Sequence, residues 1–125
     1  MNDQSMTPEE RAALLGRARS QIAFYGSTPN YAFQFDDLGF EGTTPKLGAL
    51  IKEGKVDEMA ATITDEMLEH YAVVCRWDEL ADRLIERYQG TASRLVMYLA
   101  EESIRRDPAS IGKWGEVARA VRAAA

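Results

Sequence analysis

The chain has 125 residues, a formal net charge of −5 at pH 7 and 46% hydrophobic residues. This length suffices for one globular domain with a core, and the composition excludes a disordered protein. No basic stripe stands out, which argues against nucleic-acid binding. No apolar run approaches the roughly 20 residues that are needed to cross a bilayer.

One cysteine is present, so an internal disulfide is excluded. Residues Met1–Ser5 lack the apolar core of a signal peptide. We therefore expect a cytoplasmic protein with neither a nucleic-acid partner nor a membrane partner. Residues 1–6 are expected to be disordered. Residues 7–125 are expected to form a single domain, with a helical, insertion-like region at 7–70 and a βαβα unit at 71–125.

The first half of the chain predicts a run of short helices separated by glycine and threonine–proline turns. The clearest start is Thr7-Pro8, where a hydroxyl N-cap, a proline and Glu10 match a capping box. Thr28-Pro29 and Thr44-Pro45 repeat the start signal. The predicted helices span approximately residues 7–25, 28–38, 44–53, 56–63 and 64–68.

The second half of the chain predicts two strands around a helix. Tyr71–Cys75 is a short, apolar, β-branched run that is typical of a buried strand. A helical pattern with apolar residues on one face follows, from Leu80 to Tyr88, and Gly90 is placed to end it. Leu95–Leu99 is the second strand-like run. Strand, helix and strand at this spacing predict a βαβ unit with parallel strands.

A ribbon of two parallel strands exposes backbone edges on both sides and needs helices on both faces. Such a ribbon is rarely stable alone. Asp107-Pro108 predicts a final helix that covers one face of the strands. The expected fold is therefore α/β and mainly helical, with two parallel strands that are completed by oligomerisation or by strands from elsewhere.

The segment Gln21–Tyr31 resembles part of the luciferase-like monooxygenase family, of the type that uses the deazaflavin coenzyme F-420. The resemblance extends over nearly the whole chain from Thr7. The other segments that carry it are Gly54-Lys55, Glu58–Ala60, Ile63–Leu68, Ala72–Val74, Arg87-Tyr88, Arg94–Leu99, Asp107-Pro108 and Trp114.

This resemblance implies a fold and a cofactor. Members of the family form one eight-stranded β/α (TIM-type) barrel, so the chain would be a mainly helical C-terminal segment containing the seventh and eighth strands. The implied function is that of an oxidoreductase with coenzyme F-420 or FMN. A barrel needs all of its strands to present its catalytic loops. We therefore expect the chain not to be catalytic alone and assign no catalytic residue.

Because the chain would lack most strands of the barrel, we expect it to have a partner. This partner would be a second copy of the chain or a companion barrel segment. Cys75 stands where relatives usually have a glycine after the seventh strand, and the bulkier residue limits close backbone approach there. Two further functions remain open. The chain could be a non-catalytic interaction module whose copies pair, or a small helical ligand-binding protein.

Four residues around Gly26 form the first candidate for a substrate pocket. Tyr25, Ser27, Thr28 and Tyr31 supply two phenols and two hydroxyls that could line a polar-rimmed pocket. The same residue types also fit a purely structural role. In that interpretation Ser27 or Thr28 caps the next helix, Gly26 adopts a positive φ and the tyrosines pack.

Arg76 and Trp77 are the second candidate, because they precede a helix N-terminus where an anion or a ring could bind. The structural alternative is a solvated arginine with Asp78 as the N-cap of the helix. Cys75 is expected to be a buried, inert thiol rather than a reactive one, and His70 an exposed residue at a helix end. With one histidine and no cysteine pair, no metal site is expected.

Overall fold

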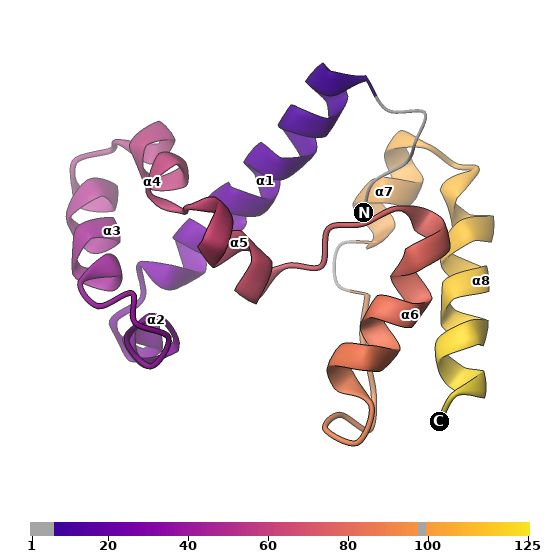
Figure 1. Cartoon of the computed structure of the whole chain (residues 1–125). Helices are drawn as coiled ribbons and strands as arrows, with labels where there is room; N and C mark the ends of the chain where they lie inside the picture. The colour runs from indigo at the N-terminus through magenta and orange to yellow at the C-terminus, as the bar shows by residue number, and fades with distance from the viewer. Residues whose placement is uncertain (1–6, 98–99) are drawn as a thin grey trace. The chain divides into compact units, whose positions relative to one another are not determined.

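The computed structural model describes residues 7–97 and 100–125, and these fall into two compact units, 7–72 and 73–125. Figure 1 shows helices and connecting segments throughout. The elements, in chain order, are α1 (Pro8–Gly26), the short 3-10 helix η1 (Pro29–Tyr31), α2 (Ala32–Asp36), α3 (Thr43–Lys52), α4 (Val56–Thr62), α5 (Asp65–Tyr71), α6 (Trp77–Tyr88), α7 (Ala100–Arg106) and α8 (Ser110–Ala123).

The first unit is built around α1, which packs against α3, α4 and α5. The predicted capping box at its start is confirmed. The Glu10 backbone N–H donates to Thr7 Oγ1 over 3.2 Å, and the Thr7 backbone N–H donates to the Glu10 carboxylate over 2.9 Å. These bonds satisfy two of the groups that a helix N-terminus otherwise leaves without partners.

A single apolar cluster explains why such short helices are stable. Helices of five to ten residues are not stable in isolation, so their stability comes from burying a side chain against neighbours. At the centre Ala23 and Leu47 have no exposed surface. The buried members of this cluster, which come from five helices and the α4–α5 junction, are Ala23, Phe35, Leu47, Met59, Ile63 and Met67.

Gly26 lies where α1 meets this cluster. A Cβ atom at this position would come within 2.7 Å of the Phe35 ring and 3.1 Å of Leu47. Gly26 is the last residue of α1 and is absent from the glycines with positive φ, which are Gly39, Gly42, Gly54 and Gly90. The expected positive φ at Gly26 is therefore wrong. The glycine is required by the close approach of Phe35.

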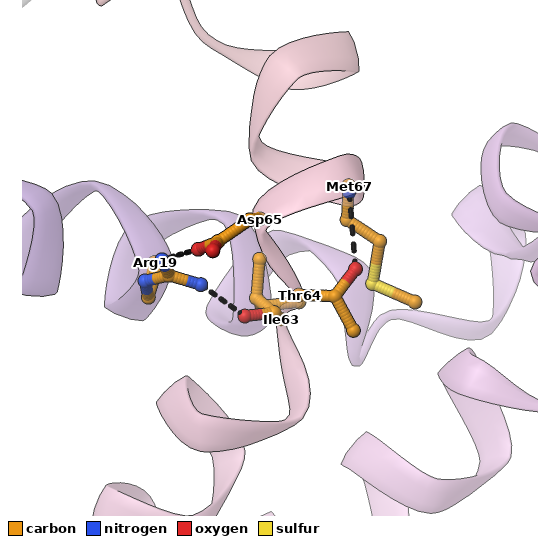
Figure 2. Close-up of polar contacts among 5 residues, drawn as sticks. All are labelled: Arg19, Ile63, Thr64, Asp65 and Met67. Carbon is orange, nitrogen blue, oxygen red and sulfur yellow. Dashed lines mark hydrogen bonds and ion pairs between the residues drawn. The ribbon is translucent and has the colours of Figure 1, made fainter.

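Arg19 joins three helices of the first unit (Figure 2). Its guanidinium donates to the Ile63 carbonyl oxygen over 2.5 Å and also bonds the Asp65 carboxylate. Ile63 directly follows α4, and Asp65 is the first residue of α5. Thr64 between them caps α5, as predicted, since its Oγ1 accepts from the Met67 backbone N–H over 3.1 Å. The arginine thus fixes the α4–α5 corner against α1.

The second unit consists of α6, α7 and α8, with α6 and α8 side by side (Figure 1). The predicted apolar stripe of α6 is confirmed, since Leu80 and Leu84 are buried. Trp114 of α8 donates its Nε1–H to Ser103 Oγ on α7 over 3.3 Å. The buried core residues are Cys75, Leu80, Leu84, Trp114 and Val117.

The predicted α/β fold is wrong, because the described residues of both units form helices and connections without a strand. Arg76 takes part in one isolated β-bridge. Val73–Cys75 and Leu95–Met97 are irregular connections, and residues 98 and 99 of the second predicted strand lie outside the described residues. The segment of a TIM-type barrel with two parallel strands, and the strands of the predicted βαβα unit, are therefore not supported.

The physical reason lies in how the two apolar runs bury their side chains. The core of α6 and α8 receives side chains from both runs, namely Val73, Cys75, Leu95 and Met97. These side chains are therefore packed without any hydrogen-bonded pairing of strands. Val96 points the other way and is 75% exposed. An alternating apolar run predicts which residues face a core, but not whether a strand or a helix supplies that core.

Several boundaries also differ from the sequence expectations. α3 begins at Thr43 rather than after a Thr44 cap, because Gly42 is its N-cap with φ +85°. α8 begins at Ser110, and the Asp107 carboxylate accepts from the Ala109 backbone N–H over 3.2 Å. α7 was not predicted.

The single domain at 7–125 stays a prediction, and the expected disorder of 1–6 concerns residues outside the described ones.

Replacing Gly26 by alanine should destabilise the protein by about 1–3 kcal/mol, because the new methyl group overpacks the Phe35 ring. The matched control is Gly16→Ala in the same helix, where a Cβ meets nothing within 4 Å. That change should stabilise by about 0.5–1 kcal/mol, since alanine favours a helix over glycine. Urea unfolding followed by circular dichroism measures both values. Equal effects of the two substitutions would show that Phe35 does not restrict position 26.

Replacing Arg19 by methionine should cost about 2 kcal/mol, because it removes charge-assisted bonds to the Ile63 carbonyl and Asp65. Asp65→Asn isolates the ion pair with this strongly exposed carboxylate and should cost at most about 1 kcal/mol. Thermal or urea unfolding of both variants gives the comparison. If both variants lose the same stability, the bond to the Ile63 carbonyl contributes nothing measurable.

Candidate functional site

The first set of candidate residues lies where α1 ends and η1 begins. Tyr25 belongs to the last turn of α1 and is 46% exposed, while Tyr31 ends η1 and is 41% exposed. The turn between them is held by its backbone. The Thr28 N–H donates to the Tyr25 carbonyl over 3.2 Å, and the Tyr31 N–H donates to the Thr28 carbonyl over 2.9 Å. The structure thus brings these residues into one turn.

The two hydroxyl residues of this turn do not cap the helix that follows. Ser27 Oγ donates backwards to the Phe24 carbonyl over 2.7 Å. Thr28 occupies the N-cap position of η1, yet its side chain makes no capping hydrogen bond. Capping of η1 therefore does not account for Ser27 or Thr28. Ser27 is instead the C-cap residue of α1, whereas Thr28 is exposed beside the two tyrosines.

Two exposed aromatic residues beside this turn were missed by the sequence reasoning. Phe24 is 59% exposed and its ring contacts that of Tyr25 edge-to-face, with 5.7 Å between the centroids. Phe33 on α2 is 57% exposed. A signal was available, because all four phenylalanines of the chain fall between residues 24 and 40. Only Phe35 among them is fully buried.

Arg76 and Trp77 belong to the second unit, at the start of α6. Arg76 Nε donates to Asp78 Oδ1 over 2.9 Å, and this hydrogen bond holds the pKa of the Asp78 carboxyl below its usual range. The Glu79 carboxylate accepts from the Arg76 backbone N–H over 3.3 Å. Two carboxylates therefore lie at the N-terminus of α6, which disfavours an anion there. Arg76 is the N-cap, so the predicted cap at Asp78 is wrong.

Trp77 is half-buried and belongs to the core of the second unit. Its ring packs edge-to-face on Trp114 with 4.9 Å between the centroids. Lys113 Nζ lies 5.7 Å from the centre of the Trp77 ring, within the range of a cation–π interaction. These contacts give Trp77 a structural role between α6 and α8. The six candidate residues therefore form two separate groups, one in each unit.

Cys75 and His70 match the structural expectations. Cys75 is buried, and this burial raises the pKa of its thiol. His70 is exposed in the last turn of α5, and its ring lies 5.8 Å from that of Phe40. Within residues 7–97 and 100–125, no three His, Cys, Asp or Glu side chains gather as metal ligands would. The described helices also include none with the length and hydropathy of a membrane span.

Comparison with known proteins gives relatives without an assigned function. The chain is 40% identical over 87 residues to proteins of Mycobacterium tuberculosis and Mycobacterium bovis that are described as uncharacterized. The match covers 70% of this chain but only 26% of each relative. No family model matches the chain. No solved structure matches it significantly.

The Cys75 thiol should react slowly with a disulfide reagent such as DTNB near pH 8. Only the thiolate reacts, and a raised pKa moves its formation to higher pH. We expect labelling to be slower in the native protein than in guanidinium, because burial raises the pKa of the thiol and shields its sulfur from the reagent. Absorbance of the released thiolate measures the rate. Equal native and denatured rates would contradict the burial of Cys75.

Proposed function

We propose that the chain is a helical part of the luciferase-like, F-420- or flavin-dependent oxidoreductases, and that it does not catalyse turnover alone. The observation that carries this proposal is the partial match to much longer proteins. Because 87 matched residues make up 26% of each relative, each relative is about four times as long as the matched segment. The segment Gln21–Tyr31 supplies the resemblance to the oxidoreductases.

In this proposal Tyr25, Ser27, Thr28 and Tyr31 contribute to a site that further polypeptide completes. The support is the exposure of Tyr25, Thr28 and Tyr31 in one turn of the first unit, with the Thr28 side chain not used for capping. A deazaflavin or FMN is the proposed cofactor, and no catalytic residue is assigned within the chain. We place the protein in the cytoplasm, with the additional polypeptide or a second copy as its partner.

A specific observation favours a second candidate, a non-catalytic interaction module. Large apolar side chains are exposed on both units, among them Phe33 on the first and Val96 and Ile111 on the second. Exposed apolar surface of this kind favours association when it is contiguous. In this alternative the copies pair, and the chain binds no cofactor.

Fluorescence titration with F-420 and with FMN tests the first proposal. We expect no turnover by the chain alone. A hybrid in which this chain replaces the matched 87 residues of the Mycobacterium tuberculosis relative should bind F-420 or FMN with a Kd within about threefold of that relative, a difference below about 1 kcal/mol. Tyr31→Ala in the hybrid should weaken binding without lowering its melting temperature. If neither the relative nor the hybrid binds either cofactor, the proposal is wrong.

Light scattering during size-exclusion chromatography tests the interaction module. That candidate predicts a mass that rises with concentration from the monomer value of 13.9 kDa. Val96→Ser and Ile111→Ser, which remove exposed apolar surface, should then shift the protein towards monomer. A monomer at all concentrations from micromolar to millimolar would contradict pairing of copies.

A further inference from the structure

The charges of the first unit are unevenly distributed. Its residues 7–72 include six basic and eleven acidic side chains, a net charge of −5. From Ser20 to Pro45 there is no lysine or arginine at all, while Asp36, Asp37 and Glu41 are present and exposed. The nearest cations in sequence are Arg19, which is paired with Asp65, and Lys46 on α3.

The same stretch carries four rings that are each 41–59% exposed. They occupy three successive elements that pack on one another, because η1 contacts both α1 and α2. We use the name acidic aromatic face for the exposed rings and carboxylates of these three elements. Its members are Phe24, Tyr25, Tyr31, Phe33, Asp36 and Asp37.

The exposure of these rings indicates the size of the ligand. A small molecule is usually enclosed by a concave site that buries most of its surface. Rings that are half open on the surface instead resemble the aromatic anchors of protein–protein interfaces, where tyrosine and phenylalanine are enriched. The occupant suited to this face is therefore a polypeptide segment.

The charges indicate the chemistry of that segment. Exposed carboxylates beside aromatic rings attract lysine and arginine through ion pairs and cation–π contacts. An anionic group, such as the phosphate of FMN, meets no cation between Ser20 and Pro45. We propose that the acidic aromatic face docks a basic polypeptide segment that also carries apolar side chains. This inference shares Tyr25 and Tyr31 with the site proposed above, where a cation for the phosphate of FMN would come from the further polypeptide.

The test measures fluorescence anisotropy of a labelled amphipathic peptide of lysine and leucine against the full chain. Two further peptides serve as comparisons, one with glutamate for every lysine and one with serine for every leucine. The lysine–leucine peptide should bind at least about tenfold more tightly than either, because the face supplies both negative charge and apolar contact. If the serine peptide binds as tightly as the lysine–leucine peptide, the proposed role of the rings is wrong. If the glutamate peptide binds as tightly, the proposed role of the carboxylates is wrong.

Paired variants locate the binding surface. The double variant Asp36→Asn, Asp37→Asn should weaken peptide binding at least about fivefold. The control Asp82→Asn, Glu86→Gln on α6 changes the net charge by the same amount and should leave peptide binding unchanged. Phe33→Ser should likewise weaken binding, whereas Ile111→Ser, which removes an exposed apolar side chain from α8, should not. Circular dichroism confirms that each variant is folded.

The proposal is overturned if the α6 and α8 variants reduce binding as much as those of the face, since attraction would then depend only on overall charge and apolarity. The outcome is separable from that of the cofactor titration, because the peptide assay contains no deazaflavin or flavin. If the variants of the acidic aromatic face lose peptide binding while the hybrid binds its cofactor normally, both proposals are supported.

Discussion

Beside the apolar cluster, the first unit depends on the contact between Arg19 and the corner joining α4 to α5. α4 and α5 have seven residues each, too few to be stable alone. The α4 C-terminus presents the Ile63 carbonyl, and Arg19 meets it from α1 while pairing with Asp65. The Arg19 cation lies at the negative end of the α4 dipole, and the Asp65 carboxylate lies at the positive end of the α5 dipole. Both charges therefore stabilise the helix end beside them. The buried Ile63 side chain can then complete the core around Leu47.

The two units reach stability in different ways. The first distributes its core over many short helices, and the close fit of Gly26 against Phe35 is the tightest example. The second relies on the longer pair α6 and α8, with the Trp77–Trp114 contact between them. In the second unit the described aromatic side chains, Trp77, Tyr88 and Trp114, pack in or against its core, whereas in the first unit several remain exposed. This difference makes the first unit the better candidate for binding.

The functional proposals rest on that exposed surface and on the length of the relatives. Ser27 is explained locally as the C-cap of α1, but Thr28 beside Tyr25 and Tyr31 makes no side-chain capping bond. Arg76, in contrast, is explained by Asp78, and Trp77 by the core. The acidic residues around the exposed rings then favour a basic partner over an anionic one.

The sequence by itself determined the local features, because these depend on residues three or four positions apart. The Thr7–Glu10 capping box, the Thr64 cap, the helix ends at Gly54 and Gly90 and the apolar stripe of α6 all follow from such patterns. The burial of Cys75 follows instead from the apolar run that it ends, although that run is not a strand. Of the candidate residues, the sequence located the turn at 25–31. It could not show that Trp77 is packed, since that depends on where α6 and α8 meet. The pairing of Arg76 with Asp78, two residues further on, is a local feature that the sequence reasoning missed.

Only the tertiary structure decided whether Val73–Cys75 and Leu95–Met97 form strands. A strand exists through hydrogen bonds to a distant segment, and the alternation of apolar side chains is equally satisfied by the packed helices α6 and α8. The role of Gly26 was likewise hidden, because the Phe35 ring that excludes a Cβ atom comes from another helix. Long-range packing therefore determined the fold class, while short-range hydrogen bonding determined the starts of α1 and α5.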